Sequence, residues 1–206
     1  MQDSFYLKYG KRFFDFFASL IGIIALSPLF LIIAILIKLY DGGPIFFKQK
    51  RIGQNFKPFY IYKFRTMIVD AEKVGPSITK GEDPRITPFG SFLRKFKLDE
   101  FPQLFNVLKG DMSLVGPRPE VEKYVKLFKE DYKQILQVKP GITDYASIYF
   151  RDEESILKNY LNPEEGYVKE VLPQKIKFYK KYLEDISFLI DLKLIFLTFW
   201  KIINGT

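Results

Sequence analysis

The sequence predicts a helix-rich α/β protein in which an apolar membrane segment precedes one small globular domain. Three observations predict it: an uncharged apolar run over residues 16–37, a hairpin pattern after that run, and helical patterns over much of the remaining chain. The chain has 206 residues, of which 48% are hydrophobic and 17% aromatic, enough for one domain with its own core plus an appendage. We therefore expect a membrane segment over residues 1–40 and a globular domain over residues 41–206.

The absence of two residue types restricts the chemistry of this chain. It contains no cysteine and no histidine, which excludes thiol nucleophiles, imidazole bases, zinc fingers and disulfides. Any bound metal would then have oxygen ligands, so Mg²⁺ or Mn²⁺ is expected. The formal charge of +8 predicts an anionic partner, which could be a nucleic acid, an anionic membrane surface or a phosphorylated small molecule.

The apolar run over residues 16–37 is long enough to cross the roughly 30 Å hydrocarbon core of a bilayer. It exceeds the roughly 7–15 apolar residues of a secretory signal, and no small-residue cleavage site follows it. Basic residues stand on both sides of the run, so the positive-inside rule assigns no orientation. These residues are Lys8, Lys11 and Arg12 before it and Lys38, Lys48, Lys50 and Arg51 after it.

Ser27 and Pro28 interrupt the apolar run near its middle. Pro28 lacks the N–H that would bond the carbonyl of Ile24, so we expect a kink there. The Ser27 hydroxyl can donate to a carbonyl one turn back and replace part of the lost bonding. Local physics favours a spanning helix with a proline kink, while the basic flanks leave open a re-entrant hairpin that returns to the same face.

A turn at residues 41–44, rich in glycine and ending in proline, separates the membrane segment from the globular domain. Residues 45–49 and 59–64 then have the composition of strands, with a turn at residues 53–55 between them. The sequence therefore predicts a β-hairpin.

Glycines and prolines over residues 73–88 predict a mobile loop after the hairpin. Helical patterns resume over residues 91–96, again after Asp99, and over residues 120–131. The chain beyond the hairpin is thus expected to be mainly helical.

The C-terminal residues 186–203 resemble a second spanning helix until their charges are considered. Asp191 and Lys193 would each cost about 2.5–3.5 kcal/mol at a bilayer centre. We expect this helix, with the basic helix over residues 175–181 before it, to lie at the membrane interface or to pack into the domain.

Two adjacent carboxylates, Asp99 and Glu100, stand at a predicted helix start. Asp99 is placed to cap that helix, and the missing N–H of Pro102 costs little in the first turn. An ordinary capped helix is one interpretation. The other is a phosphate site at the positive end of the helix dipole, where one carboxylate attacks phosphorus and its neighbour holds Mg²⁺.

Four basic residues are candidates for contacting the phosphates of such a substrate. Gly110 is expected to end the helix, and a rigid turn over residues 113–119 would fix the direction of Arg118, whose planar guanidinium suits a phosphate. Lys63, Arg65 and Arg85 are further candidates, because a diphosphate must be neutralised without histidine. Each could instead be a solvated surface charge.

The order of these motifs resembles the bacterial sugar transferase family, the small monotopic polyprenyl-phosphate phosphoglycosyl transferases, over nearly the whole chain. The matching motifs are Lys11-Arg12-Phe13-Phe14-Asp15, Ser27-Pro28, Pro44-Ile45-Phe46-Phe47-Lys48-Gln49, Tyr62-Lys63-Phe64-Arg65-Thr66-Met67, Asp83-Pro84-Arg85-Ile86-Thr87, Leu98-Asp99-Glu100, Val107-Leu108-Lys109-Gly110-Asp111-Met112-Ser113, Gly116-Pro117-Arg118-Pro119-Glu120 and Lys139-Pro140-Gly141-Ile142-Thr143. The multi-spanning amino-terminal domain of larger relatives has no counterpart here, so the resemblance is to the small form.

The resemblance implies a re-entrant helix broken at Ser27-Pro28 and a catalytic domain on the cytoplasmic face of the bacterial inner membrane. It implies that Asp99 attacks the β-phosphate of a UDP-sugar, forming a covalent phosphosugar and releasing UMP. Polyprenyl phosphate, the undecaprenyl form being expected, would then take up the sugar phosphate in the first membrane step of glycoconjugate synthesis. Glu100, with Asp99, would bind Mg²⁺. The residues that would contact phosphates are Lys63, Arg65, Arg85 and Arg118.

Three departures from the family pattern bear on these expectations. Lys97 and Phe101 differ from the usual residues around Asp99 and should leave the chemistry intact. Residues 144–147 depart in a region that could contact sugar or nucleotide, so the identity of the sugar stays open.

A non-catalytic alternative is a membrane-tethered basic module that binds anionic lipid or nucleic acid. No stacking platform or helix-turn-helix motif supports nucleic acid binding, and the basic residues alternate with acidic ones. The expected partners are therefore a UDP-sugar, polyprenyl phosphate and inner-membrane lipid, without nucleic acid. A homodimer is left open.

Overall fold

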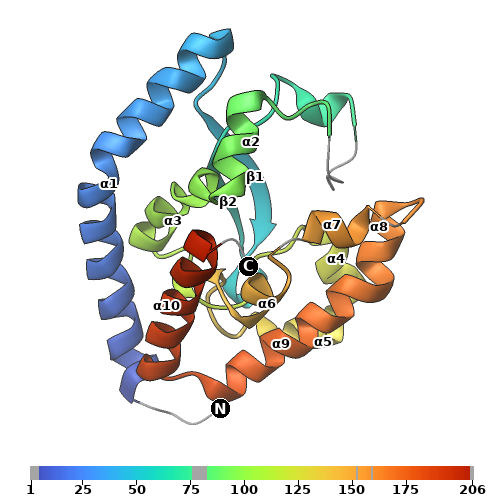
Figure 1. Ribbon diagram of the computed structural model, residues 1–206. Coiled ribbons are helices and arrows are strands. Elements are labelled where there is room, and N and C mark those ends of the chain that lie inside the picture. The colour runs from blue at the N-terminus through green and yellow to red at the C-terminus, as the bar shows by residue number, and fades with distance from the viewer. Residues whose placement is uncertain (1–4, 76–82, 152, 159, 205–206) are drawn as a thin grey trace.

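The computed structural model describes residues 5–75, 83–151, 153–158 and 160–204, and it has the helix-rich α/β fold that the sequence predicts. A long N-terminal helix runs along one side of the molecule, and helices α9 and α10 return from the far side toward it (Figure 1). The helices and strands are α1 (Lys11–Asp41), β1 (Phe46–Ile52), β2 (Pro58–Phe64), α2 (Pro88–Lys95), α3 (Gln103–Lys109), β3 (Ser113–Val115), α4 (Glu122–Leu127), α5 (Lys129–Ile135), β4 (Gly141–Thr143), α6 (Tyr145–Tyr149), α7 (Glu153–Leu157), α8 (Pro163–Gly166), α9 (Leu172–Asp185) and α10 (Phe188–Asn204).

Helix α1 contains Pro28 and bends partway along its length (Figure 1). The Ser27 hydroxyl donates to the carbonyl of Ile24 at 2.8 Å, as predicted. Gly42 ends the helix with φ of +70°, a conformation that glycine adopts without strain, which confirms the predicted turn. Within the described ranges, one helix, Tyr6–Asp41, is long and apolar enough to cross a membrane, and 11% of its most apolar window is buried in the fold.

Both ends of α1 contact the globular part of the chain. Near the N-terminal end, Lys11 Nζ donates to Asp191 Oδ2 of α10 at 2.6 Å. Toward the C-terminal end, Ile33 and Ile37 are buried against Phe64 of β2 in a common apolar cluster. The long apolar stretch between these contacts therefore begins and ends on the same folded body.

Strands β1 and β2 form the predicted antiparallel hairpin, with Phe46 opposite Phe64 and Ile52 opposite Pro58. Because side chains alternate across a strand, Phe64 enters the core while its neighbour Lys63 faces the cleft described below. Of the predicted loop over residues 73–88, residues 76–82 lie outside the described part.

Strands β3 and β4 pair in parallel, with Ser113 opposite Gly141 and Val115 opposite Thr143. The predicted turn over residues 113–119 is therefore a short strand followed by a turn. A Cβ at Gly141 would lie 2.0 Å from the backbone nitrogen of Gly116, so this close crossing requires glycine. It fixes the chain just ahead of Arg118.

The main apolar core lies among the helices α4, α5, α6 and α9. Tyr132 of α5, Leu172 and Tyr179 of α9 and Ala146 of α6 are all within it and almost completely buried. Helix α9 therefore packs against α6, and it lies on the side of the molecule opposite α1 (Figure 1).

Helix α10 packs into the domain, which is one of the two arrangements that the sequence left open, and a position at the membrane interface stays a prediction. Asp191 and Leu194 are fully buried, and Asp191 accepts hydrogen bonds from Lys11 and Tyr182. On the other side Phe196 and Trp200 are 64% and 56% exposed. Asp191, whose charge argues against a spanning helix, therefore joins α10 to α1, while Phe196 and Trp200 stay exposed on the opposite face of α10.

Candidate active site

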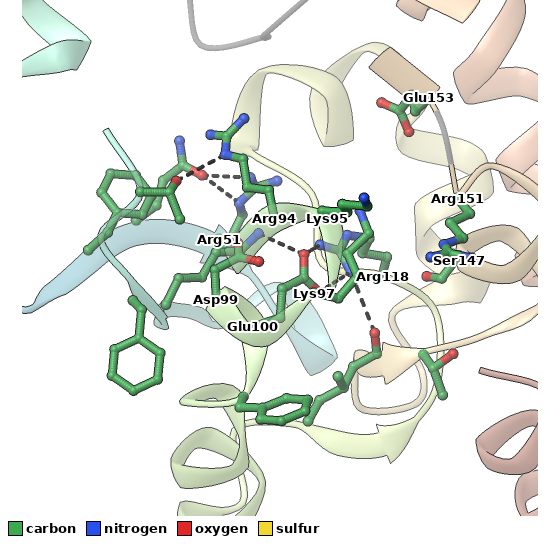
Figure 2. A pocket seen from close by; sticks show the side chains of 18 of the residues that line it. Arg51, Arg94, Lys95, Lys97, Asp99, Glu100, Arg118, Ser147, Arg151 and Glu153 are labelled. Atoms are coloured by element: carbon green, nitrogen blue, oxygen red, sulfur yellow. Dashed lines mark hydrogen bonds and ion pairs between the residues drawn. The ribbon is translucent and has the colours of Figure 1, made fainter. Parts of the chain in front are cut away.

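An open cleft of about 1840 Å³ is lined by residues of α1, the hairpin, α6 and α10 and by the two adjacent carboxylates. Figure 2 shows the carboxylates with the basic side chains around them. The lining combines apolar residues of α1 and α10 with charged residues. The apolar lining includes Phe14, Ala18, Gly22, Leu26, Ile195 and Phe199, and the polar lining includes Lys63, Lys97, Asp99, Glu100 and Arg118.

Asp99 and Glu100 lie in a single 3₁₀ turn, Leu98–Glu100, ahead of α3. The prediction that Asp99 caps the α-helix is wrong, because Pro102 is the residue before the first turn of α3 and Asp99 makes no capping bond. Lys97, the residue before the 3₁₀ turn, has φ of +54°, a left-handed conformation that is uncommon for residues other than glycine. Gly110 ends α3 with φ of +91°, as predicted.

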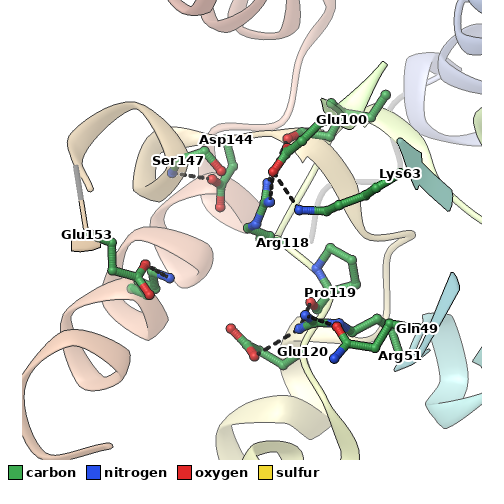
Figure 3. A network of polar contacts seen from close by, with 12 residues as sticks. Gln49, Arg51, Lys63, Glu100, Arg118, Pro119, Glu120, Asp144, Ser147 and Glu153 are labelled. Carbon is green, nitrogen blue, oxygen red and sulfur yellow. Dashed lines mark hydrogen bonds and ion pairs between the residues drawn. The ribbon is translucent and has the colours of Figure 1, made fainter. Parts of the chain in front are cut away.

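Glu100 is held by two of the four predicted phosphate-binding residues (Figure 3). Lys63 Nζ donates to Glu100 Oε1 at 2.9 Å, and Arg118 bonds both carboxylate oxygens, with Nη1 3.0 Å from Oε2. Burial acts to raise the pKa of Glu100, but Arg118 and Lys63 outweigh it and hold that pKa well below its ordinary value. Glu100 is therefore ionised, and both of its carboxylate oxygens bond to cationic side chains.

Asp99 lies beside this cluster in a different environment. It is 6% exposed, and its Oδ1 is buried without a hydrogen-bond partner among the described residues. Burial raises its pKa, against the lowering effect of the nearby Lys63 ammonium. Two neighbouring carboxyl groups whose pKa values are pushed apart are suited to different roles, and Asp99 is the one with an oxygen available to react.

The donor set of the site fits a hard divalent cation in part. The available protein oxygens are the unpartnered Asp99 Oδ1 and the oxygens of Glu100, which Lys63 and Arg118 occupy. The described residues contain no group of three or more histidine, cysteine or acidic residues placed for a metal. Mg²⁺ commonly binds through one or two carboxylates and completes its shell with water and substrate phosphates, and two carboxylates are what this site offers.

Arg65 and Arg85, the other two predicted phosphate-binding residues, line the same cleft but are engaged in ion pairs of their own. Arg65 Nη1 lies 2.7 Å from Asp41 Oδ2, and its Nε donates to the carbonyl of Pro44, which ties the end of α1 to the hairpin. Arg85 Nη2 lies 2.6 Å from Asp83 Oδ2. A phosphate contact by either residue stays a prediction, and it would require a change in these pairs.

Two further basic residues, which are not among the four predicted phosphate-binding residues, lie close to Asp99. Arg94 of α2 and Lys97 line the cleft, and both act to lower the pKa of Asp99 (Figure 2). Arg94 Nε also donates to Thr66 Oγ1 at 3.0 Å. Arg94 and Lys97 stand three residues apart just before the two carboxylates, and this spacing could have predicted that they lie near Asp99.

Comparison with known proteins gives matches over almost the whole chain. The family model described as bacterial sugar transferase matches residues 6–205. The UDP-N-acetylgalactosamine-undecaprenyl-phosphate N-acetylgalactosaminephosphotransferase of Aeromonas hydrophila is 38% identical over 95% of this chain and 44% of its own length. The UDP-glucose:undecaprenyl-phosphate glucose-1-phosphate transferase of Escherichia coli K12 is 36% identical over 93% of this chain and 39% of its own length.

A third relative has a more similar length. The exopolysaccharide production protein ExoY of Sinorhizobium fredii is 36% identical over 92% of this chain and 83% of its own length. This chain thus spans less than half the length of the Aeromonas and Escherichia proteins and most of the length of ExoY.

Proposed function

This chain belongs to the bacterial sugar transferase family, and we propose that it transfers a sugar 1-phosphate from a UDP-sugar to undecaprenyl phosphate, releasing UMP. The observation that carries the proposal is Asp99, a buried carboxylate whose Oδ1 has no hydrogen-bond partner among the described residues, beside the Lys63–Glu100–Arg118 cluster. The donor and acceptor are those in the names of the Aeromonas and Escherichia transferases. A role in exopolysaccharide or glycan synthesis follows from the name of ExoY.

In the first step, an Asp99 oxygen attacks the β-phosphorus of the donor. A bond forms between that oxygen and phosphorus, and the bond from phosphorus to the oxygen bridging the two phosphates breaks, so UMP leaves with the electron pair. Lys63 and Arg118, which bond the neighbouring Glu100 carboxylate, would balance the charge that develops on the phosphate oxygens by exchanging part of that bonding for the phosphate.

In the second step, a phosphate oxygen of the acceptor attacks the same phosphorus and Asp99 leaves as a carboxylate. The product is an undecaprenyl diphosphate sugar. Asp99 would hold Mg²⁺ or Mn²⁺ together with Glu100, which would give up part of its bonding to Lys63 or Arg118, and the cation would supply further neutralisation of the phosphate charge. Dividing one exchange into two displacements lets the water-soluble donor and the lipid acceptor use the same residue in turn.

The apolar residues of the cleft lining support a lipid acceptor. Ala18, Gly22 and Leu26 of α1 and Phe199 of α10 line the same cleft as Asp99 and Glu100. A polyprenyl chain could lie against α1 with its phosphate directed to Asp99. The cleft is thus suited to bring a membrane lipid and a nucleotide sugar to one carboxylate.

We further propose that α1 is re-entrant, with the catalytic domain on the cytoplasmic face of the inner membrane. Its contacts at Arg12 and Ile33 with the globular part are separated by roughly 30 Å of helix, about the thickness of the hydrocarbon core. A straight spanning helix would put those contacts on opposite sides of the membrane. The bend at Pro28 and the outward-facing Ile24 and Leu31, 64% and 63% exposed, support entry and return on one side.

Labelling from one side of the membrane tests this arrangement. Because the chain has no native cysteine, single cysteines at Tyr9 and Tyr40, which are 57% and 55% exposed, would report the two ends of α1. Both should react with an impermeant maleimide in inverted vesicles and stay unreacted in right-side-out vesicles, like a reference cysteine at Lys133. Reaction of the two ends from opposite sides would establish a spanning helix instead.

The activity itself is tested by measuring UMP release. The protein in detergent or nanodiscs, given undecaprenyl phosphate, Mg²⁺ and a panel of UDP-sugars, should release UMP with at least one donor, and chelation of the metal should reduce the rate. No UMP from any donor, combined with salt-sensitive binding of DNA or anionic vesicles, would favour the non-catalytic basic module. The names of the relatives lend that module no support.

A further inference from the structure

Three buried polar atoms close to Arg118 make no hydrogen bond within the described part of the chain. They are Tyr179 Oη and Ser147 Oγ, whose residues line the wall of the cleft, and Asp144 Oδ2 beside them. Tyr179 and Asp144 are completely buried. Such groups are rare in folded proteins, because a buried polar atom without a partner loses its hydration with no compensation. Several in one place therefore indicate a ligand or ordered water.

Two elements bring these atoms together. Asp144 caps α6 by accepting a hydrogen bond from the backbone N–H of Ser147 at 2.7 Å, and the Ser147 side chain also acts to lower the pKa of Asp144, so the two side chains lie together. Asp144 Oδ2 has no hydrogen-bond partner among the described residues. Helix α9 packs beneath α6 and carries Tyr179 to the same wall. Ser147 and Tyr179 both line the cleft, and Figure 3 shows Asp144 and Ser147 on the side of Arg118 opposite Lys63.

The chemistry of this wall differs from that of the phosphate side. A phenol, a serine hydroxyl and a carboxylate supply hydrogen-bond donors and acceptors, and none of the three side chains is cationic. They suit a neutral ligand with several hydroxyl or amide groups. Arg118, which lies between this wall and the Asp99–Glu100 turn, would hold the phosphate to which such a ligand is attached.

We propose that Ser147 and Tyr179, with Asp144 behind them, bind the sugar ring of the donor and determine which UDP-sugar is used. The proposal rests on the proposed function, because it places the sugar one phosphate away from Asp99. A hexose hydroxyl or an N-acetyl group would complete the hydrogen bonds that these side chains lack. Sugars without the matching group would leave them unpaired, which is a strong basis for discrimination.

The test compares donors in variants that remove one hydroxyl each. Ser147→Ala and Tyr179→Phe should each lower kcat/KM for the preferred UDP-sugar by roughly tenfold or more, the effect of losing a hydrogen bond to a buried group. The loss should be smaller for donors that lack the contacted group, so the ratio between donors changes. Inhibition by UMP, which lacks the sugar that the donor transfers, should stay unchanged.

Tyr132→Phe is the matched control. Its hydroxyl is as deeply buried as that of Tyr179 and also has no hydrogen-bond partner in the part of the chain that the structure describes, but Tyr132 does not line the cleft. This variant should keep the donor preference of the parent protein. Thermal unfolding of all three variants identifies any variant that fails to fold. If Tyr179→Phe fails to fold, Ser147→Ala, which removes one small hydroxyl, still provides the test.

Three results would overturn the assignment to the sugar. An equal loss of kcat/KM with every donor would show a structural role for these side chains. Weaker inhibition by UMP would show that they bind the nucleotide. Unchanged kinetics in both folded variants would show that they bind water and not the sugar. A parent protein that releases no UMP from any donor would overturn the proposed function, and this inference with it.

Discussion

Replacing Asp99 with asparagine is expected to reduce UMP release by at least about 10³-fold, the scale of loss when a covalent nucleophile is removed. Asparagine has nearly the same size and shape, but its amide cannot attack phosphorus. The unpartnered Oδ1 of Asp99 makes no bond within the described fold, so the substitution should cost little stability. The measurement is UMP release with saturating donor and undecaprenyl phosphate.

Asp111→Asn is the control for this result, because it removes an exposed carboxylate from the same stretch of chain. It should keep parental activity. An Asp99→Ala variant guards against slow conversion of asparagine back to aspartate. Appreciable turnover by Asp99→Ala would remove Asp99 from the role of nucleophile.

Replacing Glu100 with glutamine is expected to lower both the rate and the free energy of unfolding. The change leaves Lys63 and Arg118 in the cleft wall without their carboxylate, and the loss of a buried ion-pair partner costs roughly 3 kcal/mol even when hydrogen bonding is partly kept. We also expect a weaker dependence of the rate on Mg²⁺. Denaturant unfolding in detergent and a metal titration of the rate measure the two effects.

The stability difference between parent and Glu100→Gln should depend on pH in one direction. The folded state lowers the pKa of Glu100 below its ordinary value of 4.5, so the ionised side chain contributes stability above that pH. This contribution is lost as the pH falls through the lower folded pKa. Asp99, whose pKa is raised, is present in both proteins and affects the difference little.

The expected difference is therefore largest near neutral pH and decreases below about pH 4.5. Glu122→Gln provides a comparison, since Glu122 pairs with Lys50 and Lys126 on the exposed surface. That change should have little effect on stability, because exposed ion pairs contribute little. A Glu100→Gln difference that is as small, or that grows toward acid pH, would contradict a stabilising buried cluster.

The local features of the fold were predictable from sequence because each depends on neighbouring residues. The hairpin follows from two aromatic strands around a turn, and the ends of α1 and α3 follow from Gly42 and Gly110. The hydrogen bond from Ser27 follows from the missing N–H of Pro28. In each case local geometry leaves few alternatives.

Features that depend on contacts distant in sequence were not predictable in the same way. Asp191 looked like a charge that keeps α10 out of the membrane, and its pairing with Lys11 appears only in the folded chain. Arg65 was chosen for its charge, but Asp41 lies at the point where the hairpin meets α1. Charge alone does not distinguish a phosphate ligand from half of an ion pair.

The candidate site was predictable in composition and only partly in geometry. Asp99, Glu100, Lys63 and Arg118 do come together in one cleft. The pairing of Glu100 with both Lys63 and Arg118 could be seen only in the folded structure, as could the Asp99 oxygen that has no partner among the described residues. The same holds for the hydroxyls of Ser147 and Tyr179, because a sequence does not show whether a hydroxyl has a hydrogen-bond partner.

We propose that Asp99 carries the sugar phosphate during turnover. To test this, the protein is mixed with an active UDP-sugar in the absence of undecaprenyl phosphate and quenched, and its peptides are mapped by mass. We expect an added sugar phosphate on Asp99 that disappears when the lipid acceptor is supplied. Normal turnover with no adduct at this residue, and with kinetics that require both substrates to be bound together, would contradict the account.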